Sequence, residues 1–133
     1  MRFASFAAVG ACGFVLQIAT LQLLLIATPS GPLAATFAAV ELAVLHNFVW
    51  HERWTWRDRR GGAQTAGVVR RLVRFHVANG VTSIGAAVAC VALLTRALGW
   101  PPALANCVAV GLTGLVNFVA LDRWVFARPR RAL

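Results

Sequence analysis

The chain has 133 residues, of which 59% are hydrophobic and only 13% are charged, whereas a soluble domain is typically about 45–50% apolar and about 25% charged. A soluble protein of this length has too little interior to cover so much apolar surface, so a soluble globular fold is excluded. The net charge of +9 comes from Arg alone. Because these Arg residues lie between apolar runs rather than on one basic face, we expect no nucleic-acid partner.

Two apolar segments occupy the first half of the chain, at about residues 6–27 and 33–50. A helix that crosses roughly 30 Å of hydrocarbon needs about 20 mostly apolar residues, so each segment is long enough to span a membrane. Residues 29–32, Pro-Ser-Gly-Pro, predict a tight turn between them. The first segment is too long for the core of a cleaved signal peptide, and we interpret it as a span.

The second half has the same plan, with apolar segments at about residues 75–95 and 103–121 and a Gly-Trp-Pro-Pro turn at residues 99–102. An Arg-rich linker, about residues 58–72, joins the two halves. We therefore expect an all-α integral membrane protein of four helices, arranged as two helical hairpins in a single domain over residues 1–133.

The two halves, about residues 3–57 and 73–127, are copies of one another at an offset of 70 positions. Residues 47–56, NFVWHERWTW, return as residues 117–126, NFVALDRWVF, and the same offset pairs Gly10 with Gly80 and Ala35 with Ala105. One registration with so many matches indicates duplication of a two-span unit. Because each unit contains an even number of spans, both enter from the same side, and the repeats are parallel rather than inverted.

The orientation follows from the Arg residues. All of them except Arg96 lie before the first span, between the second and third, or after the fourth. The positive-inside rule therefore places both termini and the linker in the cytoplasm. We expect the membrane to be the plasma (inner) membrane. The Arg clusters of the linker suit contact with anionic lipid head groups, although a solvated loop that satisfies topology alone explains them equally well.

Polar side chains within the spans are the first candidates for function. Glu41 is the only acid within an expected span, and it is either a proton-coupled or substrate-contacting carboxylate or a neutral acid that bonds another helix. A polar seam follows one face of the last span and recurs in the second: Asn106, Thr113 and Asn117, with Thr36 and Asn47. Such a seam lines a polar path or, as we favour, bonds the helices together.

The repeated ending supplies the remaining candidates. Arg53 and Arg123 follow their spans beside Trp54 and Trp124. Aromatic side chains at this depth anchor a helix at the membrane interface, and an Arg between them is suited to hold a lipid phosphate through its planar fork of donors. Both interpretations stay open. The candidate substrate-binding residues are Arg53, Arg123, Asn47, Asn117, Glu41, Trp54 and Trp124.

The sequence gives little support for enzyme chemistry. Cys12, Cys90 and Cys107 lie in apolar spans without metal-ligand spacing. The three His residues form no H-E-x-x-H pattern, and neither a glycine-rich phosphate loop nor a nucleophile elbow is present. We therefore expect no catalytic residue, no metal and no cofactor.

The early Phe6-x-x-x-Gly10, the related Arg74-Phe75 before Gly80 and the two Asn-Phe…Arg-Trp-x-aromatic endings resemble the GtrA-like family across about residues 3–127. The resemblance implies a small four-span bacterial membrane protein linked to cell-surface polysaccharide synthesis. It also implies translocation of polyprenyl-phosphate-linked sugars from the cytoplasmic to the outer leaflet, with Arg53 and Arg123 in contact with the phosphate.

Three functions are compatible with these features. The leading hypothesis is a translocator (flippase) of a polyprenyl-phosphate-linked sugar, and because four helices give only a thin wall, we expect a homo-oligomer among membrane lipids. The alternative is a non-catalytic membrane anchor that recruits a glycosyltransferase. A small-molecule or ion exporter that uses Glu41 as its coupling carboxylate is the third.

The topology is testable by cysteine labelling of intact cells. We expect a Gly62→Cys variant without the natural Cys residues to resist an impermeant external thiol reagent, because the linker lies in the cytoplasm. Ready labelling of that position, in cells shown to be intact, would overturn the orientation.

Overall fold

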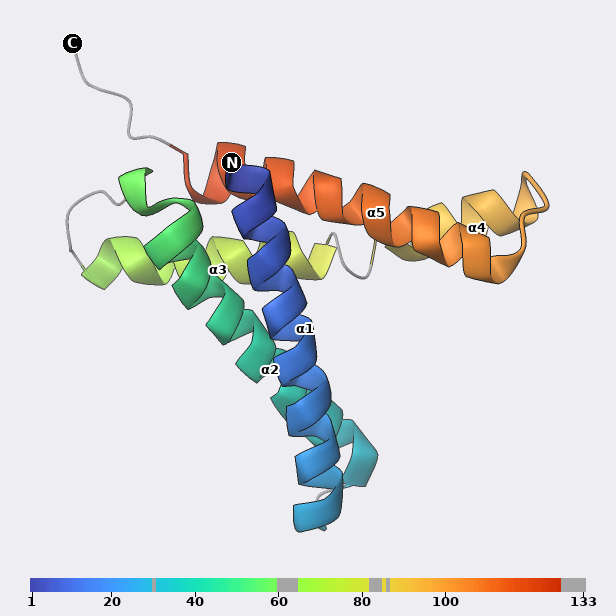
Figure 1. The fold of residues 1–133 in the computed structure, drawn as a ribbon, viewed down its shortest axis with the longest axis horizontal. Helices are drawn as coiled ribbons and strands as arrows, with labels where there is room; N and C mark the ends of the chain where they lie inside the picture. The colour runs from blue at the N-terminus through green and yellow to red at the C-terminus, as the bar shows by residue number, and fades with distance from the viewer. Residues whose placement is uncertain (30, 60–64, 82–84, 86, 128–133) are drawn as a thin grey trace. The chain divides into compact units, whose positions relative to one another are not determined.

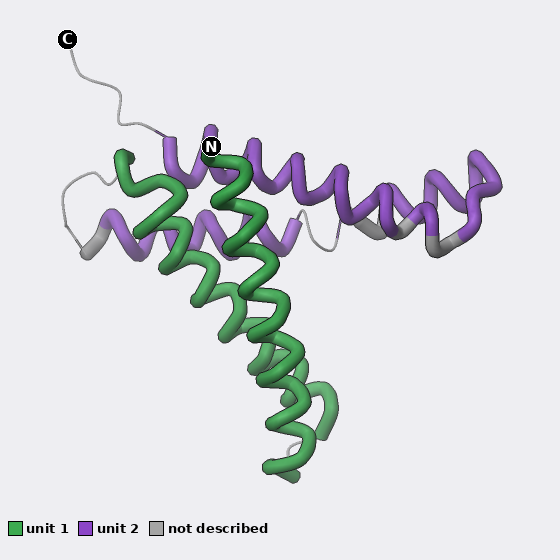
Figure 2. Tube along the Cα trace, in the orientation of Figure 1, with its two compact units in different colours: residues 1–60 green, residues 61–133 purple. Residues whose placement is uncertain are grey.

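The computed structural model describes residues 1–29, 31–59, 65–81, 85 and 87–127, and every regular element in these ranges is a helix (Figure 1). The expected all-α membrane fold is confirmed. The chain divides into two compact units, Met1–Arg60 and Gly61–Leu133 (Figure 2). The division falls within the Arg-rich linker, and the two units are described separately.

Unit 1 is a hairpin of two long helices, α1 (Arg2–Ala27) and α2 (Gly31–Trp50), which lie side by side (Figure 1). Gly31 has a φ of 77° in the turn, a conformation that residues with a Cβ rarely adopt. The buried residues of α2 include three Ala residues spaced by four, Ala35, Ala39 and Ala43, followed by Val44 and Phe48. Small side chains let two helix backbones approach closely, which is how helices associate in a membrane.

In unit 1 the helical backbone continues beyond the end of α2. A π-helix, η1 (His51–Thr55), continues from it, and a short 3-10 helix, η2 (Arg57–Arg59), follows. The continuous stretch Gly31–Thr55 is long and apolar enough to cross a membrane, as is Arg2–Ala27. The helical stretch therefore continues five residues beyond the expected boundary at residue 50.

Unit 2 contains α3 (Thr65–Gly80), α4 (Ala87–Arg96), α5 (Pro102–Ala120) and a second π-helix, η4 (Leu121–Val125). Helix α4 packs against α5, and α3 packs against η4 and α5. Ala105 and Ala109 are buried on α5, at the positions that correspond to Ala35 and Ala39 in unit 1. The stretch Cys107–Val125 also has the length and hydropathy of a membrane span.

The third expected span, residues 75–95, lies partly outside the described part of the chain. Its described residues are helical, because α3 extends to Gly80, Val81 and Gly85 are π-helical, and α4 begins at Ala87. Residues 82–84 and 86 lie outside the described part of the chain, and α3 also starts ten residues earlier than residue 75.

A close approach of α1 and α2 depends on one glycine. Gly13 is buried on α1, and a Cβ placed on it would lie 2.6 Å from Nδ2 and 2.7 Å from Cγ of Asn47 on α2. By contrast, a Cβ on Gly10 would meet nothing within 4 Å. The hairpin therefore requires glycine at position 13 to accommodate the Asn47 carboxamide, but not at position 10.

This difference predicts the outcome of a matched pair of substitutions. Gly13→Ala should lower stability relative to Gly10→Ala by about 1–3 kcal/mol, the usual cost of overpacking a well-packed contact. Gly10→Ala should be neutral or slightly stabilising, because Ala is the better helix former. Thermal unfolding of the purified variants in detergent provides the measurement. In a Gly13→Ala/Asn47→Ala variant the penalty should shrink, and a penalty that stays unchanged would contradict this contact as its cause.

Candidate functional site

The repeated ten-residue ending folds in the same way in both units. In unit 1 the backbone N–H of Trp56 donates to the carbonyl of His51 at 2.9 Å, and in unit 2 the N–H of Phe126 donates to the carbonyl of Leu121 at 2.8 Å. Both are bonds between residues five apart, which define a π-helical turn. Such turns are rare and occur frequently at functional sites.

The burial of side chains in the two endings is also identical, position by position. The residues at 51, 55 and 56 are buried, and so are those at 121, 125 and 126. The Arg-Trp pair lies between the buried positions and is exposed in both units, as Arg53-Trp54 and Arg123-Trp124. Each ending therefore packs one face against its own unit and presents an Arg and a Trp outward. We call the two Arg-Trp pairs the exposed pairs.

In unit 1 the packed face of η1 is aromatic and polar. The His51 ring stacks on Phe6 of α1, with centroids 5.3 Å apart and planes 13° apart, and Trp56 meets it edge-on at 5.2 Å. Nδ1 of His51 lies 3.0 Å from the Thr55 hydroxyl, so the buried imidazole is hydrogen-bonded. The contacts hold η1 against the first turns of α1.

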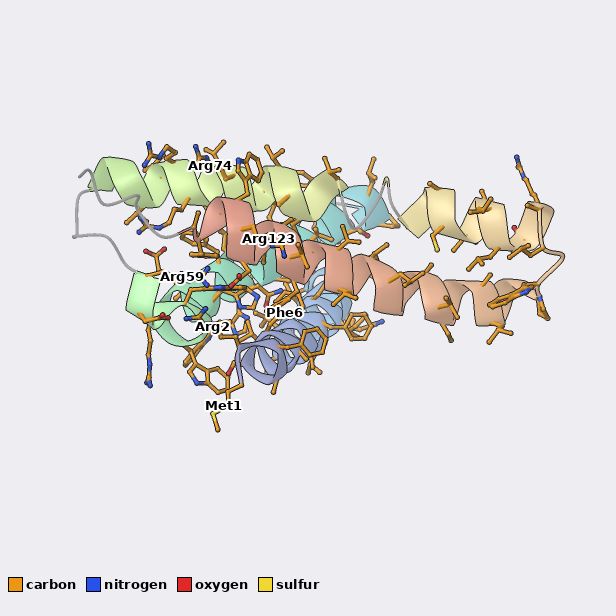
Figure 3. The ribbon with its side chains drawn as sticks, turned by 90° about the horizontal axis from the view of Figure 1, so that it is seen from above. Met1, Arg2, Phe6, Arg59, Arg74 and Arg123 are labelled. Atoms are coloured by element: carbon orange, nitrogen blue, oxygen red, sulfur yellow. The ribbon has the colours of Figure 1, made fainter. Side chains whose placement is uncertain are left out.

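A salt bridge supports the same end of unit 1. Arg2, at the start of α1, donates from its guanidinium to Oδ2 of Asp58 in η2 at 2.5 Å. Figure 3 shows Arg2 and Phe6 on the first turns of α1. Because both partners are substantially exposed, the ion pair contributes little stability and serves to orient η2.

In unit 2 the packed face of η4 is apolar instead. Leu121 and Val125 stand where unit 1 has His51 and Thr55, and they are buried, as is Phe75 of α3. The exposed pair also differs, since Cζ of Arg74 lies 5.7 Å from the centre of the Trp124 ring. This is a cation–π contact, and Arg74 and Arg123 are both labelled in Figure 3. Two endings with one backbone thus have different chemical surroundings.

The two Asn residues of the motif each bond a neighbouring side chain. Asn47 accepts from Nδ1 of His46 at 3.2 Å, and Nδ2 of Asn117 donates to Oδ1 of Asn79 on α3 at 3.2 Å. Oδ1 of Asn117 is buried and has no hydrogen-bond partner within the part of the chain described. The Asn117 bond joins α5 to α3.

The other members of the expected polar seam are two Thr residues, which bond within their own helices, and Asn106. The hydroxyls of Thr36 and Thr113 each donate to the carbonyl four residues earlier in their own helix, at 2.8 Å. The Asn106 side chain lies outside the described residues. Among the described side chains, the seam therefore does not form a continuous polar path.

Glu41 is separated from the exposed pair of its own unit. It is half-buried on α2, twelve residues before Arg53, which corresponds to about 18 Å along the helix at 1.5 Å per residue. Glu41 and Arg53 therefore lie at different depths along the hairpin. In unit 1, the structure brings Trp54 and Arg53 together at one end and leaves Glu41 deeper in the span.

A groove in unit 1 was missed by the sequence analysis. Val9 and Cys12 of α1 and His46, Trp50 and Trp54 of the α2–η1 stretch line a half-open cavity of about 190 Å³. The signal in the sequence was the spacing of four from His46 to Trp50 to Trp54, which places all three on one helix face. We name this cavity the tryptophan groove. No cluster of three or more His, Cys, Asp or Glu side chains suited to a metal occurs among the described residues.

A comparison with curated proteins finds similarity to the dolichol-phosphate mannosyltransferase of Pyrococcus furiosus. The two sequences are 43% identical over 44 residues, which is 33% of this chain. The match spans only 11% of the length of that enzyme. It therefore concerns one segment of a much longer protein.

A comparison with protein families covers nearly the whole chain. The family described as the GtrA/DPMS transmembrane domain matches residues 5–126, from the first turns of α1 to the last residue of the second repeated ending. This confirms the resemblance that the two endings indicated, and the chain belongs to the GtrA/DPMS transmembrane domain family.

Proposed function

We propose that this protein moves a polyprenyl-phosphate-linked sugar across the plasma membrane for the synthesis of cell-surface polysaccharide or glycoconjugate. Family membership and the partial similarity to a dolichol-phosphate mannosyltransferase support a membrane function connected with such lipids. The observation that carries the proposal is the pair of Arg side chains held outward by two equivalent π-helical turns.

The chemistry of the exposed pairs suits a lipid phosphate. Neither Arg53 nor Arg123 forms an ion pair or hydrogen bond within the described residues, so their donors are available. A guanidinium donates two parallel hydrogen bonds to phosphate oxygens, which Lys cannot reproduce. Trp54 and Trp124 lie beside them and suit the boundary between hydrocarbon and head groups, where an indole ring is favourable.

Translocation of this kind breaks no covalent bond, which is why we propose a protein that is not itself an enzyme. The prenyl tail stays in the hydrocarbon throughout, and only the phosphate and sugar need a polar route. Asn47, Asn117 and Glu41 are polar groups within the spans that can contribute to it, Glu41 from its deeper position. A four-helix wall is thin, so we further propose that two or more copies assemble to form the route.

Recruitment of a glycosyltransferase is a second candidate, favoured by a specific observation. The similar stretch of the Pyrococcus protein is a small part of a chain whose name is that of a transferase. A segment that is covalently joined to such an enzyme in one protein can act as its separate membrane partner in another. In that case the exposed pairs anchor the protein at the interface and the Arg-rich linker contacts the enzyme.

Lys substitution of the exposed pairs tests the proposed role of Arg. Arg53→Lys and Arg123→Lys should each reduce translocation of a polyprenyl-phosphate sugar in reconstituted vesicles by about tenfold or more, because a hydrogen bond to a charged group contributes about 1.5–3 kcal/mol. The two losses should differ, since Leu121 replaces His51 in the second ending. Membrane insertion should survive, because Lys satisfies the positive-inside rule equally well.

The matched control is Arg57→Lys, an exposed Arg in η2 that belongs to neither pair, and its rate should equal that of the natural protein. The amount of each variant that is incorporated into the vesicles is measured, so that transport rates are compared per protein. A double Arg53→Lys/Arg123→Lys variant that transports at the natural rate would show that the pairs serve topology alone, and recruitment would then be the better explanation.

A further inference from the structure

The tryptophan groove has a direction. Its wall on the α2–η1 stretch extends from Trp54, beside Arg53 at the end of the span, to His46 deeper along the helix. These residues are eight apart, which corresponds to about 12 Å along the helix axis. Val9 and Cys12 form the opposite wall on α1. The groove therefore leads from the level of an exposed guanidinium toward the apolar middle of the hairpin.

The second half of the chain lacks the residues that would make this groove. At the offset of 70, Val116 and Ala120 stand in place of His46 and Trp50. Trp124, the counterpart of Trp54, has the Arg74 guanidinium over its ring, whereas the residue that corresponds to Arg74 in the first half is Ala4. The duplicated ending thus keeps an open aromatic wall in unit 1 only.

The size of the groove limits what it holds. A cavity of about 150 Å³ lined by apolar side chains takes up benzene, and pockets for drug-sized ligands begin at about 300 Å³. At about 190 Å³ the groove has room for a short apolar segment, and its mostly apolar lining suits such a segment better than the hydroxyl groups of a sugar. Its lining is dominated by two indole rings, Val9 and a thiol, and His46 supplies one polar edge.

We propose that the tryptophan groove binds the isoprene units next to the phosphate of the polyprenyl carrier, while Arg53 holds the phosphate. This inference rests on the proposed function for the class of lipid. Arg53 directly precedes Trp54, which lines the groove, so a ligand with its phosphate at Arg53 has the groove close to the first carbons of its tail.

A prenyl chain fits such a site better than the acyl chain of a bulk phospholipid. Each isoprene unit carries a methyl branch and a planar double bond, so it is wide enough to touch both walls and flat enough to lie on an indole face. It also has fewer rotatable bonds per carbon than a saturated chain, so less conformational entropy is lost when it is held. The site then recognises the carrier by its first units, whatever sugar is attached.

Photo-crosslinking tests the proposal directly. The probe is a polyprenyl phosphate with a diazirine on the isoprene unit next to the phosphate, incorporated with the full-length protein into vesicles of phosphatidylethanolamine and phosphatidylglycerol. Mass spectrometry of the irradiated protein should locate crosslinks on the groove residues of α1 and α2. Unlabelled polyprenyl phosphate should displace them, and added phosphatidylglycerol should not. Crosslinks at residues 121–126 should be several-fold weaker.

Two variants and one control define the site. Cys12→Trp places an indole in the groove from an exposed position and should reduce groove crosslinking at least fivefold. Trp50→Ala removes an indole ring from the groove and introduces the residue found at the corresponding position of the second half, Ala120. It should also weaken groove crosslinking. Leu45→Trp is the matched control, because Leu45 is exposed on α2 and does not line the groove. It should crosslink as the natural protein does.

The possible outcomes separate this proposal from the proposed function. The groove assignment would be overturned if phosphatidylglycerol displaced the probe as effectively as polyprenyl phosphate does. It would also be overturned if Cys12→Trp and Trp50→Ala both folded and still crosslinked like the natural protein. Vesicle transport by the natural protein would in that case still stand. Conversely, specific crosslinking in a protein that moves no lipid would establish the groove as a carrier-binding site and remove the translocator function.

Discussion

The packing of each π-helical turn against the first helix of its own unit determines how the functional side chains are presented. In unit 1, η1 packs on α1, and in unit 2, η4 packs on α3. A bond between residues five apart widens the last turn, so that positions 51, 55 and 56 and their counterparts all face inward. Arg53 and Arg123 are then directed outward with their neighbouring Trp side chains. Without the turn, an α-helical continuation would rotate these residues around the helix axis.

Duplication followed by divergence explains why the two units are alike in backbone and unlike in chemistry. The backbone bonds and the burial pattern repeat at an offset of 70, whereas the buried pair is His51 and Thr55 in one unit and Leu121 and Val125 in the other. Leu121 and Val125 are apolar and need no hydrogen bond when buried, and His51 and Thr55 are hydrogen-bonded to one another. Neither pair therefore carries the cost of a buried polar group without a partner. The exposed Trp side chains have diverged in the same way, because Trp54 lines a groove whereas the Arg74 guanidinium lies over the ring of Trp124.

Much of this was predictable because helical periodicity, duplication and a long apolar run are local properties of the sequence. The family, the all-α membrane fold and the ends of the first hairpin helices follow from such patterns. Two features depend on contacts between residues far apart in the chain, which periodicity does not encode. The stack of Phe6 on His51 joins residues 45 apart in the chain, and the tryptophan groove needs α1 to complete a wall that α2 alone suggests.

The claim on which this account depends most is that the protein itself carries the lipid-linked sugar across the membrane. Purified protein, in vesicles that contain a polyprenyl-phosphate sugar and no glycosyltransferase, should steadily expose inner-leaflet sugar to an impermeant glycosidase added outside. In protein-free vesicles the inner-leaflet pool should stay protected. Protection that is as complete with the protein as without it, and that is lost only when a transferase is added, would contradict translocation by this chain.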